Sequence, residues 1–170
     1  AVVVENCGEE PVYLERVMSL CVDQPYGNWD WMTFYGRHEM ERQVSRTAVH
    51  HGIQSAGGLR GASSHQYNPF VVLADPKASE TQGNCYGFSL LYSGNFLAEA
   101  EKDQFNQTRV LMGIHPGNFR YKLEQGESFY TPETAMVYSD KGFEKMSHIF
   151  HRAIRNNLCR GKFKNARRPV

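Results

Sequence analysis

Large and small side chains alternate along residues 85–94, which is the period of a β-strand. The two faces of this segment are formed by Tyr86, Phe88, Leu90 and Tyr92 and by Gly87, Ser89 and Ser93. The pattern predicts a half-buried central strand with one face of small residues. Residues 96–103 alternate in the same way, and the intervening Ser93-Gly94-Asn95 predicts a turn that joins the two segments in a hairpin.

Other strand signals lie on both sides of this segment. At the start of the chain, residues 1–7 and 12–22 form a predicted hairpin around the turn-forming residues 8–11. Further strands are predicted from β-branched, aromatic or alternating residues over 29–35, 107–114 and 128–138. A polar and charged stretch, residues 37–46, follows the first of these.

Near the end of the chain the apolar period changes from two residues to three or four. The apolar positions are Phe143, Met146, Ile149, Phe150, Ile154 and Leu158. They predict one amphipathic helix over residues 141–159, ended by Arg160-Gly161, because glycine suits the C-terminal cap of a helix. Many short strands before one helix predict an all-β, antiparallel sandwich over residues 1–140, followed by a linker helix and tail over 141–170.

The composition is that of an ordinary globular domain. A chain of 170 residues can bury a real core, and its net charge of +1 gives no electrostatic reason to expect nucleic acid or a membrane surface as a partner. Its 4 cysteines form no metal or redox motif, so we expect buried thiols in a reducing, cytoplasmic compartment, with disulfides as the alternative. Residues 1–10 show no signal peptide and no initiating Met, which predicts the interior of a longer protein.

Several irregular motifs occur in an order that resembles one enzyme family. They are residues 10–16 (EPVYLER), 60–70 (RGASSHQYNPF), 86–96 (YGFSLLYSGNF), 107–113 (QTRVLMG), 115–119 (HPGNF) and 123–133 (LEQGESFYTPE). Over nearly its whole length the chain is similar to the N-terminal, non-catalytic β-domain region of α-galactosidases in glycoside hydrolase family 36. The resemblance implies a supersandwich like that of galactose mutarotase and a homo-oligomer, commonly a tetramer. It also implies a catalytic barrel and α-galactosides such as melibiose and raffinose as partners.

Two catalytic signatures of that family are missing from the sequence. A retaining glycosidase needs two carboxylates roughly 5–5.5 Å apart across the scissile bond. In the family, one is an aspartate two residues after a lysine and the other lies in a glycine-rich loop, and neither context occurs here. We therefore expect no catalytic residue, metal or cofactor in this chain. Hydrolysis would require a barrel in other polypeptide.

The resemblance places a sugar-facing loop at residues 36–44 (GRHEMERQV). In bacterial relatives this loop carries a small residue, a Trp and a cluster of acidic residues and Arg, and it helps to wall the active site of the oligomer. Here His38, preceded by Arg37, stands at the Trp position. The aromatic platform is reduced, but His38 can still stack on or hydrogen-bond to a sugar. The alternative is a solvated surface with weak ion pairs.

Hydroxyl and amide side chains gather before Pro69 in residues 63–70 (SSHQYNPF). Such residues are typical of a turn whose side chains bond nearby backbone amides. The other interpretation is an interface or pocket rim, in which Asn68 joins Arg37 and His38 as a substrate-binding residue. His65 is expected to be buried and hydrogen-bonded rather than catalytic.

Three other groups have both a functional and a structural interpretation. His148 and His151 have metal-ligand spacing on the predicted helix, but without a visible third ligand they are expected to be core or surface residues. The basic tail from Arg152 onward lacks stacking aromatics, so a linker packed on a following domain is expected rather than a nucleic-acid site. The aromatic group could be a sugar platform, but is more often core: Tyr26, Trp29, Trp31 and Phe34.

The sequence thus supports one principal hypothesis and two alternatives. The principal hypothesis is the N-terminal domain of an α-galactosidase, with a role in oligomer assembly and in shaping the substrate entrance. The first alternative is a free-standing carbohydrate-binding module. The second is an epimerase that uses a histidine and a carboxylate as acid and base.

Overall fold

Two antiparallel sheets face each other in the computed structural model of the chain, which describes residues 1–167. Residues 168–170, the end of the predicted tail, lie outside the described residues. Helix α1 (Gly142–Ala153) covers the outer face of one sheet, so the layers are sheet, sheet and helix. The predicted all-β sandwich with a C-terminal helix is confirmed.

The larger sheet has five strands in the order β13-β8-β7-β4-β5. Its strands are β4 (Asp30–Arg37), β5 (Met40–Ala48), β7 (Tyr67–Ala74), β8 (Cys85–Leu90) and β13 (Thr134–Ser139). The smaller sheet has four strands in the order β3-β10-β9-β6. They are β3 (Met18–Asp23), β6 (Gly52–Gly58), β9 (Phe96–Lys102) and β10 (Thr108–Ile114).

The main core lies between these two sheets. It is formed by apolar side chains from alternate positions of both: Trp29, Trp31, Val49, Val71, Leu73, Phe88, Leu90, Phe96, Ala98, Ala100, Val110 and Met112. The period-two faces predicted around Phe88 and Phe96 therefore both point into the core, as a sandwich requires. Both tryptophans are buried, so the interpretation of Trp29 and Trp31 as a sugar platform is wrong.

The second core cluster lies between the larger sheet and helix α1. It contains Met32, Val72, Ala74, Ala78, Cys85, Met146 and Phe150. Gly87 is the position on β8 where the helix comes closest, because a Cβ there would lie 2.7 Å from both Met146 Sδ and Phe150 Cε2. The helix therefore packs against the small-residue face that the sequence predicted for this strand.

The predicted helix over residues 141–159 is present, although its last turn differs from an α-helix. After α1, residues Ile154–Leu158 form a π-helical turn, and Cys159 has an extended backbone. The helix thus ends just before the predicted Arg160-Gly161 stop.

Both predicted hairpins are wrong in their pairing. Strands β8 and β9 belong to different sheets, so Ser93-Gly94-Asn95 carries the chain across the sandwich. At the start of the chain, β1 (Val3–Glu5) and β2 (Val12–Leu14) do not pair with each other; β1 pairs with β12 (Ser128–Tyr130), and β2 with β11 (Tyr121–Leu123). The strand predicted over 128–138 is interrupted at Pro132, between β12 and β13.

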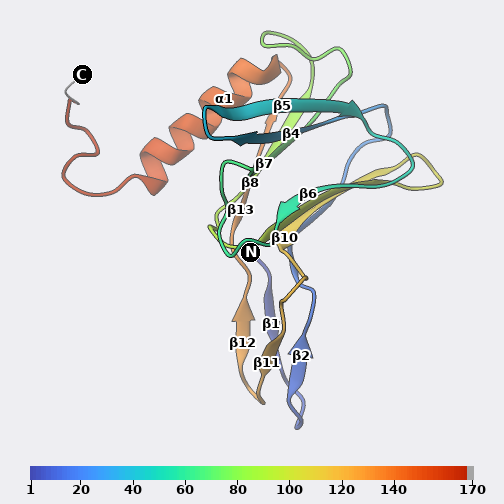
Figure 1. Cartoon of the computed structure of the whole chain (residues 1–170), viewed down its shortest axis with the longest axis vertical. Coiled ribbons are helices and arrows are strands. Elements are labelled where there is room, and N and C mark those ends of the chain that lie inside the picture. The colour runs from blue at the N-terminus through green and yellow to red at the C-terminus, as the bar shows by residue number, and fades with distance from the viewer. Residues whose placement is uncertain (168–170) are drawn as a thin grey trace.

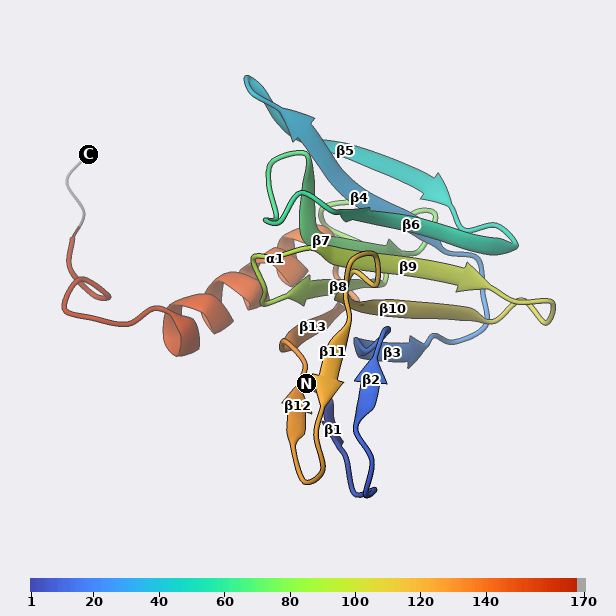
Figure 2. The ribbon, with the colours of Figure 1, turned by 60° about the horizontal axis from the view of Figure 1, so that its bottom comes forward.

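The pairs β1-β12 and β2-β11 project together from one end of the sandwich (Figure 2). Asn6 joins them, because its buried side-chain amide donates to Glu10 O at 2.9 Å and to Leu123 O at 3.1 Å. Its Oδ1 accepts from Gly8 N at 3.0 Å. One asparagine therefore connects the start of the chain to β11, which lies more than 100 residues further along the sequence.

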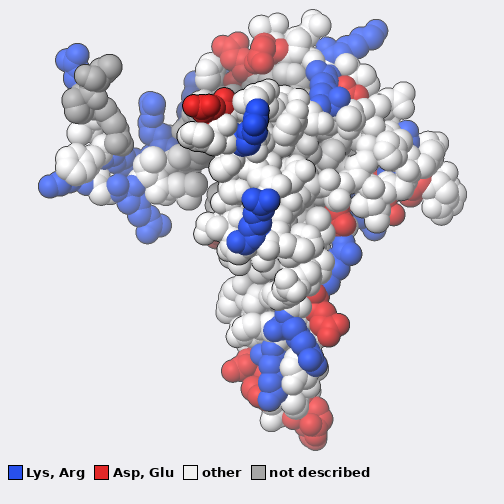
Figure 3. Space-filling view, viewed as in Figure 1, with Lys and Arg blue, Asp and Glu red and all other residues white. Residues whose placement is uncertain are grey.

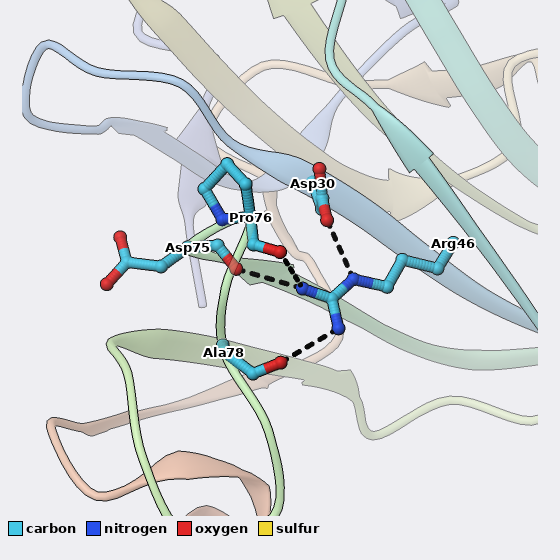
Figure 4. A network of polar contacts seen from close by, with 5 residues as sticks. All are labelled: Asp30, Arg46, Asp75, Pro76 and Ala78. Atoms are coloured by element: carbon cyan, nitrogen blue, oxygen red, sulfur yellow. Dashed lines mark hydrogen bonds and ion pairs between the residues drawn. The ribbon is translucent and has the colours of Figure 1, made fainter.

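The loop between β7 and β8 holds the N-terminus of helix α1. Phe143 N donates to Ser79 O and Glu144 N to Glu80 O, each at 3.0 Å, so backbone carbonyls bind amides of the first helical turn. Arg46 on β5 clamps the same loop (Figure 4), with Nη1 donating to Ala78 O at 2.9 Å and Nη2 to Asp75 O at 2.9 Å. The guanidinium also bonds Asp30 Oδ2 at 2.7 Å and Pro76 O at 3.0 Å.

Candidate functional site

Arg37 and His38 lie at the tip of a hairpin rather than in the predicted loop over 36–44. Strand β4 ends at Arg37, which is opposite Met40 on β5, and the turn includes Glu39 with a φ of 65°. Strand β5 was not predicted from the sequence, because nearly all of its residues are exposed and the strand therefore shows no apolar alternation. The tip projects from the sandwich (Figure 2), and both Arg37 and His38 are exposed to solvent.

Asn68 lies elsewhere, on β7, in a groove of about 540 Å³ between the outer face of the larger sheet and helix α1. The groove is lined by Met32, Phe34, Arg42, Val44, Asn68, Phe70, Val72, Glu80, Ser89, Phe143, Met146, Ser147, Phe150, His151 and Ile154. Asn68 Oδ1 is buried and has no hydrogen-bond partner among residues 1–167. The structure thus brings Asn68 together with Arg42, but Arg37 and His38 do not line the groove.

Aromatic rings form the floor of this groove. Phe70 packs against Phe34 with ring centroids 5.4 Å apart and against Phe150 at the same distance, edge to face. These rings come from β4, β7 and α1. The sequence predicted the apolar face of the helix, but it did not show which strands this face meets.

The residues before Asn68 form a turn, as one interpretation of the sequence predicted. Ser64 Oγ accepts from Gln66 N at 3.2 Å, and Ser63 N donates to Ser93 O at 2.6 Å. His65 is exposed, so the expectation that it is buried is wrong.

The helical histidines have no metal-site geometry. His148 and His151 are both exposed, which agrees with the surface interpretation. Among residues 1–167, no cluster of three or more His, Cys, Asp or Glu side chains could hold a metal ion. In the same range, no helix is both long and apolar enough to span a bilayer.

The cysteines differ from the expectation of buried thiols. Only Cys85 is buried, whereas Cys7, Cys21 and Cys159 are exposed, and all of them are free thiols. Burial, with a smaller contribution from the charge of Asp75, raises the pKa of Cys85 to about 11.

We therefore expect Cys85 to resist modification in the native protein. A raised pKa keeps its thiol protonated at pH 8, and thiolate is the reactive form. A thiol-specific chromogenic reagent at pH 8 should modify Cys7, Cys21 and Cys159 rapidly and Cys85 only after urea is added. Modification of all the thiols before unfolding would contradict this assignment.

Comparison with known proteins identifies the family. A model of the glycosyl hydrolase family 36 N-terminal domain matches residues 1–124, and a melibiase model matches residues 128–170. The chain belongs to glycoside hydrolase family 36. Its sandwich is the N-terminal domain type of the family 36 α-galactosidases, as the sequence motifs indicated.

Several family 36 enzymes are similar to almost the whole chain. α-Galactosidase AgaA of Geobacillus stearothermophilus is 48% identical over 166 residues, which are 98% of this chain and 23% of AgaA. The bifunctional α-galactosidase/sucrose kinase AgaSK of Mediterraneibacter gnavus is 46% identical over 167 residues, 98% of this chain and 18% of AgaSK. The chain thus spans about a fifth of the length of these relatives.

Solved family 36 structures have the same fold. The crystal structure of AgaA carrying A355E and D548N, in complex with raffinose, superposes with a TM-score of 0.96 at 48% identity and covers 99% of this chain and 23% of that one. The α-galactosidase of Lactobacillus brevis superposes with a TM-score of 0.95 at 38% identity.

Proposed function

We propose that this chain serves as a non-catalytic part of an α-galactosidase that hydrolyses terminal α-galactosides such as melibiose and raffinose in the cytoplasm. The family 36 match over residues 1–124 carries this proposal. Its similarity to AgaA, whose crystal structures include raffinose and stachyose complexes, supports the substrate class. In this proposal residues 1–140 form the sandwich, and residues 141–170 lead towards the catalytic barrel.

The domain's role is to assemble a homo-oligomer and to shape the substrate entrance. Arg37 and His38 support that role because they stand on a projecting hairpin tip, where they can reach a neighbouring subunit without disturbing the core. Asn68 contributes an unpaired carbonyl oxygen from the adjacent strand β7. These three residues are the substrate-binding residues of the proposal.

A chimera tests this function directly. The segment of Geobacillus stearothermophilus AgaA that matches this chain, at 48% identity over 166 residues, is replaced by this chain. We expect the chimera to hydrolyse an aryl α-galactoside and raffinose, while the isolated chain shows no turnover above buffer. In the chimera, Arg37→Ala combined with His38→Ala should raise KM for raffinose about tenfold, the loss of about 1.4 kcal/mol of binding.

The matched control is His50→Ala, which removes an exposed histidine just beyond the other end of β5. It should leave KM unchanged, and none of these exposed substitutions should change the melting temperature. A folded chimera without hydrolysis would refute the proposed function. An unchanged KM in the Arg37/His38 variant would refute substrate binding by the hairpin tip, but it would leave the proposed function of the chain intact.

One observation favours the carbohydrate-binding module as a second candidate. Aromatic rings and the unpaired Asn68 Oδ1 share one groove, as in many ligand pockets. Calorimetry of the isolated chain with galactose, melibiose and raffinose separates the two functions, since only a module should bind at millimolar or lower concentration. The epimerase gains no such support: among the described residues, no histidine is ion-paired with a carboxylate.

A further inference from the structure

The apolar face of the C-terminal helix extends beyond the surface that covers it. Met146 and Phe150 are 5% and 7% exposed, because they pack on the larger sheet. Farther along the same face, Ile154 and Leu158 are 44% and 49% exposed. An amphipathic helix normally buries its whole apolar face, so this face has room for a second partner.

The uncovered part of the helix borders a hollow surface. Ile154 lines the groove described above, as does Val44 on β5, which is 54% exposed. A second hollow, of about 560 Å³, shares His151 and Ile154 with the first and continues past Cys159. The two hollows therefore form one long surface, here called the α1 groove, with an aromatic floor at one end and exposed apolar edges.

The surroundings of the α1 groove are strongly basic at its C-terminal end. Between residues 145 and 167 there is no acidic residue, and the basic residues are Lys145, Arg152, Arg155, Arg160, Lys162, Lys164 and Arg167. Figure 3 shows basic side chains along the helical arm that carries this end of the chain. A complementary partner presents apolar side chains within an acidic surface.

The family matches indicate which partner has access to this surface. The melibiase model matches residues 128–170, which include the helix that forms one wall of the groove, and the chain spans only 18–23% of its relatives' length. We infer that the α1 groove docks an acidic, apolar surface patch of the catalytic domain of the same α-galactosidase polypeptide. This inference rests on the proposed function and assigns the contact to a specific face.

Two measurements on the chimera described above test this docking. The first follows modification of Cys159, an exposed thiol in the second hollow, by a maleimide, with the labelled peptide identified by mass spectrometry. Modification should be at least tenfold slower in the chimera than in the isolated chain, because the catalytic domain covers the groove.

The second measurement places a charge on the groove edge. In the chimera, Val44→Lys should raise the rate of Cys159 modification at least fivefold above that of the unsubstituted chimera, because the charge weakens docking. Ile53→Lys is the matched control, because Ile53 is 58% exposed on β6 in the other sheet and does not line the groove. It should leave the rate unchanged. Both variants should keep the melting temperature of the isolated chain, because both side chains are already exposed.

The outcomes separate this inference from the proposed function. An active chimera in which Cys159 reacts as fast as in the isolated chain overturns the docking inference alone, and so does an equal effect of Val44→Lys and Ile53→Lys. Protection of Cys159 in the isolated chain by raffinose would make the groove a sugar site. Protection that grows with the concentration of the isolated chain would make it a contact between copies. Either result overturns docking of the catalytic domain.

Discussion

Replacing Gly142 with alanine should lower the free energy of unfolding by roughly 3–5 kcal/mol, at the upper end for single substitutions. Gly142 has a φ of +72°, and its added Cβ would overlap Ser79 O and lie 2.6 Å from both Gln82 N and Glu80 O. All of these are backbone atoms, so no side chain can rotate away. Relief requires the loop to move, which breaks its bonds to the first turn of α1.

Gly126→Ala is the matched control for this substitution. Gly126 has nearly the same φ, +74°, but no heavy atom of the part of the chain that the structure describes lies within 4 Å of its added Cβ. Alanine there should cost only about 1 kcal/mol, the penalty for a left-handed conformation. Urea unfolding followed by fluorescence of the buried Trp29 and Trp31 measures both variants. Similar losses at the two positions would show that crowding around Gly142 is unimportant.

Local alternation predicted the buried faces of the strands better than their partners. The faces that contain Phe88 and Phe96 were correct, because burial of alternate residues is a property of each strand by itself. The pairing was wrong because Ser93-Gly94-Asn95 reverses the chain equally well within one sheet or between two. Turn residues encode a reversal, whereas the choice of sheet depends on packing across the core.

Two strands of the larger sheet escaped prediction for opposite reasons. Strand β5 is exposed along nearly its whole length, so polar residues replace the expected alternation. Strand β7 is buried on both faces at its end, with Val71 and Leu73 towards the smaller sheet and Val72 and Ala74 towards the helix. Its unbroken apolar run was a usable signal, because strands covered on both faces lose their polar positions.

The candidate site could be predicted only in part. Asn68 was selected from a motif, but its groove is assembled from Phe34, Phe70 and Phe150, which are distant in the sequence. No local pattern shows that β4, β7 and the C-terminal helix meet. The clamp made by Arg46 was missed for the same reason, since its carbonyl partners come from a loop about 30 residues away.

Removing that clamp is the second large expected effect. Arg46→Met keeps an unbranched apolar stem but deletes the guanidinium, which lies 5.7 Å from the centre of the Phe143 ring and binds the carbonyls of Asp75, Pro76 and Ala78. Hydrogen bonds to charged groups contribute roughly 1.5–3 kcal/mol each, but the loop is partly solvated and water replaces some of them. We therefore expect a total loss of about 2 kcal/mol in urea unfolding.

Arg109→Met provides the comparison, because the Arg109 guanidinium likewise bonds an aspartate, Asp23, at 2.7 and 3.0 Å, but no backbone carbonyl of the described residues. That pair lies on the surface, with side chains 49% and 41% exposed, so solvent screens it and its loss should lower the free energy of unfolding much less than loss of the Arg46 clamp. Hydrogen exchange adds a local measure. The Phe143 and Glu144 amides donate to carbonyl oxygens of the clamped loop, so only Arg46→Met should speed their exchange. Equal stability losses and unchanged exchange would mean that Arg46 does not position the helix.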